Sequence, residues 1–333
     1  MSDAGRASGV SRAGGTATRV LGVDGGQSAI RLRVSDDPRI VEVDGVSRAE
    51  GDAIEAVAHA VSDGWRRGSF QPADRAVLGL TTAPSTGADA DRLAGLVGRA
   101  IDVAEVWVTD DAVTAHAGAV ERRPGVSLVA GTGVACLALP DAGEPRIIGG
   151  HGFLLGDEGG AFWLGARGLG AVLRAEEGRG PATTLRAAAT RRYGTLDELH
   201  VRLHDDPRPV HAIAAFAPDV LDAADDGDPV AIGIVDTAAE ALLDVARTGV
   251  AWCRAGAPGP TVAPTRLALG GRLLEPGSTL RRRLDDRLAT VGLPVTAGSA
   301  VGTPLDGAIA LGGADDPGPY AGLVHVWTRV AVA

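Results

Sequence analysis

A strand, a glycine turn and a second strand occur in this order twice, and this repeat constrains the fold of the chain more than any other feature. The first copy is RVLGVDGGQSAIRLRV, from Arg19 to Val34, where apolar and arginine side chains alternate as in a half-buried strand. The second copy begins at Gly125, about one hundred residues later, with GVSLVAGTGVACLALPD. A third strand is expected after each copy, in RIVEVDG and in PRIIGG. The repeat predicts two similar domains that face each other.

Strands and helices alternate after the first copy. Helical patterns are expected at 51–68 and 90–101, and strands at 76–82 and 105–111. After the second copy a mostly helical segment is expected, followed by a strand, a helix, a strand and a final helix. Three antiparallel strands followed by such alternation predict an α/β fold in which mixed five-stranded sheets carry helices on their faces.

The patterns divide the chain into four parts. Residues 1–17 hold mainly small residues and scattered arginines without an apolar segment, so we expect a disordered tail and no signal peptide. An N-terminal domain is expected over 18–117, and a C-terminal domain over 118–302 with a helical insertion at about 152–264. Residues 303–333 are expected to form a helix and a tail. In one interpretation, this segment returns to the N-terminal domain.

Composition excludes several classes of protein. The chain has no lysine and all 32 basic residues are arginine, which excludes Walker-A loops, protein-kinase sites and Schiff-base chemistry. The net charge of −10 argues against nucleic-acid binding, which depends on clustered basic residues. Cys136 and Cys253 are the only cysteines, too few for a disulfide framework or a cysteine-rich metal site. No apolar run is long enough to span a membrane, and we expect a cytoplasmic protein.

The first glycine turn leaves two interpretations open. Gly25 and Gly26 lead into a strand and not into a helix, so the spacing of a dinucleotide-binding loop does not fit. Asp-Gly is a common hairpin signal, and an ordinary tight turn is one interpretation. In the other, backbone N–H groups and the Ser28 hydroxyl bind phosphate oxygens, while Asp24 holds Mg²⁺ through water. The second turn, residues 131–133, favours phosphate binding, because two facing turns could clamp a triphosphate between them.

Two acidic segments are candidates for chemistry. Asp110 and Asp111 end a strand and open a helix, where one aspartate can cap the helix while the other accepts a proton from an attacking hydroxyl. Asp157 and Glu158 lie in the glycine-rich segment GGHGFLLGDEGG, which is typical of a polar pocket wall. A carboxylate in this segment could accept hydrogen bonds from two sugar hydroxyls. A helix is expected to begin near Glu158, with Asp157 as its cap.

Together these segments resemble the N-acetylglucosamine kinase and BadF/BadG-type ATPase family of the actin-like sugar kinases. The matching segments run in order through nearly the whole chain after its tail: GVDGGQS, TDDAVTAHAGA, GVSLVAGTG, GGHGFLLGDEGGAFWLG, EGRGPAT, LALGG and TPLDGAIAL. The block with Asp157 and Glu158 is the most specific of them, whereas the glycine turns are shared across the superfamily. The resemblance implies two RNase H-like domains that close over ATP and a sugar, typically in a homodimer.

The resemblance also implies roles for individual residues. Asp111 is implied as the catalytic base in contact with the sugar, and Asp24 as the residue near Mg²⁺. The other implied contacts are those to the ATP phosphates (Gly25, Gly26, Gln27, Ser28, Gly131, Thr132 and Gly133), to the adenosine (Gly270 and Gly271) and to the sugar (Gly150, His151 and Asp157).

Three departures from the family pattern concern the second turn and the sugar-binding part. Val134 and Ala135 follow the second turn where the family commonly has Ser and Asn, and His151 stands where Trp is common. The family's sugar-contacting Asn has no clear counterpart in DGVSRAEGD. Because the phosphate motifs match and the sugar-contacting residues differ, both acetylated and free amino sugars stay open as substrates.

We therefore expect a Mg·ATP-dependent hexosamine kinase that phosphorylates the 6-hydroxyl of N-acetylglucosamine or glucosamine, with N-acetylmuramic acid as an alternative substrate. A second alternative is an ATPase activator of a radical dehydratase or aryl-CoA reductase, whose cysteines bridge an iron–sulfur cluster between subunits. Cys136 and Cys253 lie in segments expected to be buried, which argues against an activator. A sugar-sensing regulator would need a basic helix-turn-helix, and none is visible. The expected partner is a small-molecule sugar, without nucleic acid or membrane.

Overall fold

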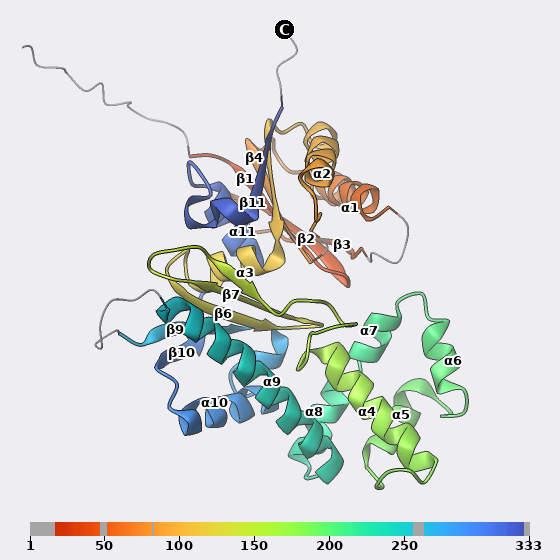
Figure 1. Cartoon of the computed structure of the whole chain (residues 1–333). Helices are drawn as coiled ribbons and strands as arrows, with labels where there is room; N and C mark the ends of the chain where they lie inside the picture. Colours follow the sequence, from red (N-terminus) through yellow and green to blue (C-terminus); the bar gives the residue numbers. More distant parts are fainter. Residues whose placement is uncertain (1–16, 47–51, 82, 256–262, 330–333) are drawn as a thin grey trace, which may run out of the picture.

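Two mixed β-sheets with helices on their faces form the molecule, as the computed structural model in Figure 1 shows. The structure describes residues 17–46, 52–81, 83–255 and 263–329. The expected disordered tail therefore lies, apart from its last residue, outside the described residues. None of the described helices is long and apolar enough to cross a membrane.

The first sheet has six strands in the order β11-β5-β4-β1-β2-β3. These are β1 (Val20–Gly25), β2 (Ala29–Val34), β3 (Val41–Asp44), β4 (Arg75–Leu80), β5 (Glu105–Asp110) and β11 (Val324–Thr328). Strands β1, β2 and β3 are antiparallel, β4 and β5 run parallel to β1, and β11 is antiparallel to β5. The alternating side chains of β2 bury one face, as their sequence pattern predicts.

The second sheet repeats this plan with five strands in the order β10-β9-β6-β7-β8. They are β6 (Gly125–Ala130), β7 (Val134–Leu139), β8 (Arg146–Ile148), β9 (Thr265–Gly270) and β10 (Val295–Ser299). Here β6, β7 and β8 are antiparallel, and β9 and β10 continue parallel to β6. The predicted α/β fold with two similar mixed sheets is confirmed. The first sheet differs from the expected five strands because β11, from the far end of the chain, pairs with β5.

Four helices belong to the first sheet or lie beside it. The helices α1 (Ala53–Gly68) and α2 (Gly87–Ala100) pack on its outer face, and α3 (Asp111–Ala119) and α11 (Pro304–Gly312) lie between the two sheets. The first of them begins where the Asp52 side chain accepts hydrogen bonds from the N–H groups of Ile54 and Glu55. Its apolar stripe then packs into the core on that face of the sheet.

The two central helices cross in close contact because small residues meet there. A Cβ atom at Gly307 would lie 1.8 Å from the carbonyl oxygen of Thr114, and one at Gly118 would lie 2.2 Å from that of Thr303. Only glycine permits this approach of the two backbones. As a result α3 is held against α11 on one side and against β6 and β7 on the other, with its N-terminus between the sheets.

The chain between β8 and β9 is mostly helical, and its helices cover the outer face of the second sheet and extend beyond it (Figure 1). They are α4 (Ala161–Glu176), α5 (Leu185–Tyr193), α6 (Leu199–His204), α7 (Pro209–Ala214), α8 (Ala217–Asp225) and α9 (Pro229–Arg254). The short η1 (Arg272–Leu274) and α10 (Thr279–Val291) follow β9. The longest helix, α9, packs against four strands and anchors the largest apolar core.

The end of the chain is tied to the first sheet by a buried arginine. After η2 (Gly318–Leu323) the chain enters β11. The guanidinium of Arg75 on β4 donates to the carbonyl of Ala314 at 2.6 Å, forms an ion pair with Glu105 at 2.9 Å and stacks on Trp107 at 4.2 Å. These contacts join the segment after α11 to two strands of the sheet.

Candidate functional site

The C-terminal ends of three neighbouring parallel strands carry polar side chains at one edge of the first sheet. Strand β1 ends near Asp24, β4 is followed by Thr81, and β5 is followed by Asp111. The register pairs Leu80 with Gly25 on one side and with Asp110 on the other, which brings Thr81 next to Asp111. In α/β sheets such carboxyl edges are where ligands bind.

Thr81 was not among the residues that the sequence pointed to, yet it contacts the expected catalytic base. Its hydroxyl donates to the Oδ2 atom of Asp111 at 2.5 Å, and its backbone N–H donates to the carbonyl of Gly25 at 2.9 Å. A hydroxyl directly after the strand AVLGL was the available signal. Its significance depends on the pairing of β4 with β5, which local sequence does not show.

The two adjacent aspartates at the start of α3 have different surroundings. The Oδ1 atom of Asp110 accepts from the N–H of Ala112 at 2.9 Å, so Asp110 caps the helix. The pKa of Asp111 is raised to about 7, first by burial and then by the charge of Asp110, while the hydrogen bond from Thr81 acts in the opposite direction. A carboxyl group with a pKa near neutrality is suited to accept a proton during a reaction.

Asp24 lies one strand further along the same edge. Its pKa is raised to about 6, first by burial and then by the charge of Asp111, while the guanidinium of Arg31 opposes the shift. Arg31 is the partner of Asp24 across β1 and β2, and its Nη1 atom lies 3.7 Å from the Asp24 Oδ2 atom. The site thus holds two half-buried carboxyl groups whose negative charges act on each other across β4.

The first glycine turn closes between β1 and β2, with Gln27 and Ser28 at its tip. The N–H of Gly26 donates to the carbonyl of Ala29 at 2.9 Å. Neither Gly25 nor Gly26 has a positive φ. Close packing favours glycine at position 25, because a Cβ atom there would lie 2.4 Å from the Leu80 side chain.

The second glycine turn closes between β6 and β7 and is held by a helix. The N–H of Gly131 donates to the carbonyl of Gly133 at 2.9 Å. The carbonyls of Gly131 and Thr132 accept from the N–H groups of Ala161 and Phe162 at 2.9 and 3.0 Å, at the start of α4. The backbone of the turn therefore satisfies donors that a helix N-terminus otherwise leaves free.

The start of α4 differs from the sequence expectation. The helix begins at Ala161 and not near Glu158, and its cap position is Gly160, which provides no side-chain hydrogen bond. The prediction that Asp157 caps this helix is wrong. The reason is that the carbonyls of the second turn already accept from the first turn of the helix, and Asp157, with a φ of 61°, faces the glycine turn instead.

Asp157 joins the second turn to the glycine-rich segment before α4. Its carboxylate accepts hydrogen bonds from the backbone N–H groups of Val134 and Gly152, and a Cβ atom at Gly133 would lie 2.3 Å from its Oδ2 atom. Burial raises its pKa, and the charges of Asp111 and Glu158 raise it further. Because the charge of Asp111 acts on it, Asp157 and Asp111 lie close enough for their charges to interact although they belong to different sheets.

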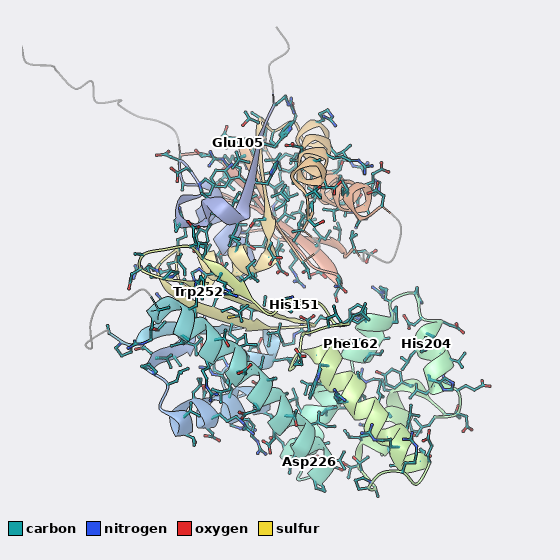
Figure 2. All side chains as sticks on the ribbon, in the orientation of Figure 1. Glu105, His151, Phe162, His204, Asp226 and Trp252 are labelled. Carbon is teal, nitrogen blue, oxygen red and sulfur yellow. The ribbon has the colours of Figure 1, made fainter. Side chains whose placement is uncertain are left out.

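The remaining expected ligand residues lie beside these turns. Gly150 has a φ of 69°, a backbone conformation that favours glycine, and His151 follows it in an exposed position between the first sheet and α4 (Figure 2). Gly270 ends β9 and Gly271 follows it, and a Cβ atom at Gly271 would lie 2.3 Å from the carbonyl oxygen of Ala130. The residues expected at the adenosine therefore adjoin the second turn.

The two cysteines do not form a reactive pair in this arrangement. Cys136 is fully buried on β7, and its burial raises the pKa of the thiol to about 12. Cys253 on α9 is partly buried, which raises its pKa to about 11. Neither thiol ionises near neutral pH, and within the described residues no group of three or more His, Cys, Asp or Glu side chains is arranged to hold a metal ion.

Comparison with known proteins gives the family. Residues 21–250 match the model of the BadF/BadG/BcrA/BcrD ATPase family. The chain belongs to this family. Its membership, predicted from the motifs above, is confirmed, and the match includes both glycine turns and the acidic residues of the site.

Two curated relatives are kinases of amino sugars. The chain is 28% identical over 196 residues to an N-acetylmuramic acid/N-acetylglucosamine kinase from Clostridium acetobutylicum, covering 56% of this chain and 62% of that protein. It is 25% identical over 231 residues to the glucosamine kinase GspK from Vibrio cholerae, covering 66% and 76%. The match thus spans less than two thirds of the length of the first of these relatives.

Solved structures extend the likeness over nearly the whole chain. A Chromobacterium violaceum protein provisionally described as an N-acetylglucosamine kinase superposes with a TM-score of 0.66 at 25% identity, covering 89% of this chain and 99% of that one. A Porphyromonas gingivalis protein with the same provisional description gives a TM-score of 0.64 at 19% identity, over 88% and 98% of the two chains. The second likeness supports the fold alone.

Proposed function

We propose that the protein is an ATP-dependent kinase that phosphorylates the 6-hydroxyl of an amino sugar. The observation that carries the proposal is the half-buried carboxyl group of Asp111, which has a pKa near neutrality and lies at a strand edge shared with the first glycine turn. Its charge also reaches Asp157 beside the second turn. The names of the two curated relatives support an amino sugar as acceptor.

Asp111 is proposed to act as the general base. As the sugar O6 forms its bond to the γ-phosphorus, the bond from that phosphorus to the bridging oxygen breaks and ADP leaves. The proton of the sugar hydroxyl passes to the Asp111 carboxylate. Because the pKa of Asp111 is about 7, a substantial fraction of this group is ionised at neutral pH and can accept the proton.

The two glycine turns are proposed to hold the phosphates. Gly25, Gly26, Gln27 and Ser28 would act from the first sheet, and the second turn, residues 131–133, from the second. Both turns follow the first strand of a sheet, and a close packing contact explains a glycine in each. Gly270 and Gly271 lie beside the second turn, which supports their proposed place at the adenosine.

The residues present fit a magnesium ion bound through water and phosphate oxygens. Asp24 is a half-buried carboxyl group at the strand edge next to the first turn, and hard oxygen ligands are those that Mg²⁺ prefers. No set of three protein ligands surrounds it among the described residues. When bound, the ion would supply positive charge to the phosphates in a chain that has no lysine.

On the sugar side, Gly150, His151 and Asp157 are the proposed contacts. Asp157 already accepts two backbone N–H groups, and its remaining lone pairs would accept sugar hydroxyls. We treat the two sheets as two domains, over 18–117 and 118–302, that close over both substrates. The repeated strand order supports this division. We also propose that the protein forms a homodimer and is located in the cytoplasm.

A coupled assay of ADP release tests the proposal. The acceptors are N-acetylglucosamine, glucosamine, N-acetylmuramic acid, N-acetylmannosamine and glucose, and we expect activity with at least one of the amino sugars. In the variant Asp111→Asn, turnover should fall by about 10²–10⁴-fold while ATP binding measured by calorimetry stays within about threefold. Activity with none of the sugars would contradict the kinase, and near-normal turnover of the variant would contradict Asp111 as the base.

The buried cysteines argue against the activator of a radical enzyme. An activator needs thiolates that reach a cluster shared between subunits, whereas Cys136 is fully buried with a raised pKa. The purified kinase should be colourless and free of iron.

A further inference from the structure

The hydroxyl of Thr81 is directed at the proposed base by the register of the first sheet. Leu80 pairs with Asp110 in the parallel ladder of β4 and β5, so the next residue of each strand, Thr81 and Asp111, face each other beyond the ladder. The Thr81 hydroxyl donates to the Oδ2 atom of Asp111 at 2.5 Å, a short bond of the kind formed with an ionised acceptor.

Both partners of this hydrogen bond are held by the backbone. The N–H of Thr81 donates to the carbonyl of Gly25 in the first glycine turn at 2.9 Å. Asp111 is the first residue of α3, and this helix presses on β4 where a Cβ atom at Gly79 would lie 2.1 Å from the Thr114 Oγ1 atom. A β-branched side chain such as threonine has few rotamers, which fixes the direction of its hydroxyl.

We infer that Thr81 is a positioning residue that orients the Asp111 carboxylate toward the sugar hydroxyl and connects the base to the first phosphate turn. The inference rests on the proposed function, in which Asp111 is the base. One oxygen of the carboxylate is held by Thr81, so the group cannot rotate freely between reaction cycles. Through Gly25, a shift of the first turn on phosphate binding would be passed to the base.

The charged groups around Asp111 give this hydrogen bond an electrostatic role as well. The carboxylates of Asp110 at the end of β5, Asp24 across β4 and Asp157 before α4 face it, and the guanidinium of Arg31 pairs with Asp24. The negative neighbours and burial raise the pKa of Asp111. The Thr81 hydroxyl lowers it, because it stabilises the ionised form.

The substitutions Thr81→Val and Thr81→Ser separate the hydroxyl from the shape of the side chain. Thr81→Val should lower kcat about tenfold at pH 7 and leave KM for ATP within about twofold, since the orienting bond acts on the chemical step. The acidic limb of its kcat profile should move up by about one pH unit. Thr81→Ser should recover most of kcat.

Thr237→Val is the matched control, because the Thr237 hydroxyl also donates a hydrogen bond, to the Gly233 carbonyl on the exposed side of α9. It should leave kcat and the profile unchanged. If Thr81→Val keeps the wild-type kcat and the wild-type limb, Thr81 does not position the base. If Thr81→Ser is as slow as Thr81→Val and neither limb moves, the role of Thr81 is structural only, and the inference is overturned.

A second measurement does not depend on kinase activity. The carboxyl carbon of Asp111 can be followed by NMR during a pH titration of the protein labelled at aspartate, and Asp111→Asn identifies its signal. The pKa of Asp111 should be higher in Thr81→Val than in the wild type and in Thr237→Val. If the pKa is raised in Thr81→Val but the protein phosphorylates no sugar, the proposed function is contradicted and the Thr81–Asp111 hydrogen bond is supported. If the pKa is unchanged in Thr81→Val, the hydrogen bond itself is contradicted.

Discussion

The two glycine turns occupy the same place in their sheets but are held in different ways. The first turn is fixed by strands: it follows Asp24, packs on Leu80 and accepts the backbone N–H of Thr81. The second turn follows Ala130, which has no charge, and its carbonyls cap α4. The two copies of one motif are thus stabilised by different contacts.

This difference shows how two similar sheets can contribute different chemical groups to one site. The edge of the first sheet has half-buried carboxyl groups with raised pKa values, which suits proton transfer and cation binding. At the second sheet the turn depends on a helix and on Asp157, so its geometry is coupled to the segment that precedes α4. Substitutions in the two turns should therefore have different effects.

Among substitutions in the two turns, the largest effect is expected at Gly133. In Gly133→Ala the new Cβ atom would collide with the Asp157 carboxylate, whereas in Gly131→Ala it would meet nothing within 4 Å. We expect kcat/KM to fall about 100-fold in the first variant and by a smaller factor in the second, because small displacements of a site cost this much. Steady-state kinetics measure both. Equal losses in the two variants would show that the contact with Asp157 does not hold the turn.

A smaller effect is expected in the first turn. The Cβ atom of Gly25→Ala would meet the flexible end of the Leu80 side chain, which can move, at a cost of about 1–3 kcal/mol in the free energy of unfolding. Chemical denaturation measures this cost. The double variant Gly25→Ala/Leu80→Ala should recover part of it, since it removes the collision, and no recovery would mean that the strain lies in the backbone of the turn.

The raised carboxyl pKa values should lower the free energy of unfolding at neutral and basic pH. The folded pKa of Asp111 is about 7 against an ordinary 3.8, so the folded state holds the proton more tightly than the unfolded state between these values. Stability therefore falls as pH rises through this window. Asp111→Asn should be more stable than the wild type at pH 8 by about 1–3 kcal/mol and show little difference at pH 4. Denaturation at both pH values checks the sign.

The smallest effect is expected at a buried histidine that ties α3 to the second sheet. The Nε2–H of His116 donates to the Gly125 carbonyl at 3.1 Å, so its Nδ1 atom accepts from the Tyr320 hydroxyl at 2.8 Å. Tyr320→Phe should cost about 1 kcal/mol, measured by thermal unfolding. Burial lowers the pKa of His116 to about 4, and hence stability should fall as pH drops from 6.5 toward 4. An unchanged melting temperature would show that this link is not needed.

Much of the fold could be predicted because its signals are local. Alternation in β2 and the acidic and glycine residues at the ends of β1 and β5 lie within single elements, and they indicated both the sheets and the position of Asp24 and Asp111 at a strand edge. The repeated strand–turn–strand unit supplied the relation between the two sheets.

The features that could not be predicted depend on contacts between distant segments. The start of α4 is set by carbonyls in residues 131–132, about thirty residues earlier in the chain. Thr81 gains its place from the pairing of β4 with β5. The sixth strand, β11, depends on β5, and the Thr109 hydroxyl donates to the carbonyl of Leu323, 214 residues away, at 2.8 Å. No local pattern specifies such partners.

The position of β11 and α11 also has a consequence for synthesis on the ribosome. Val20 on β1 and Val77 on β4 are buried beneath α11, whose Gly312 lies against both, yet α11 and β11 follow every strand of the second sheet in the chain. The first sheet is thus translated early but cannot cover its inner face until the second sheet has been made. Its apolar inner surface stays open during translation, which favours late, cooperative folding and recognition by chaperones in the interval.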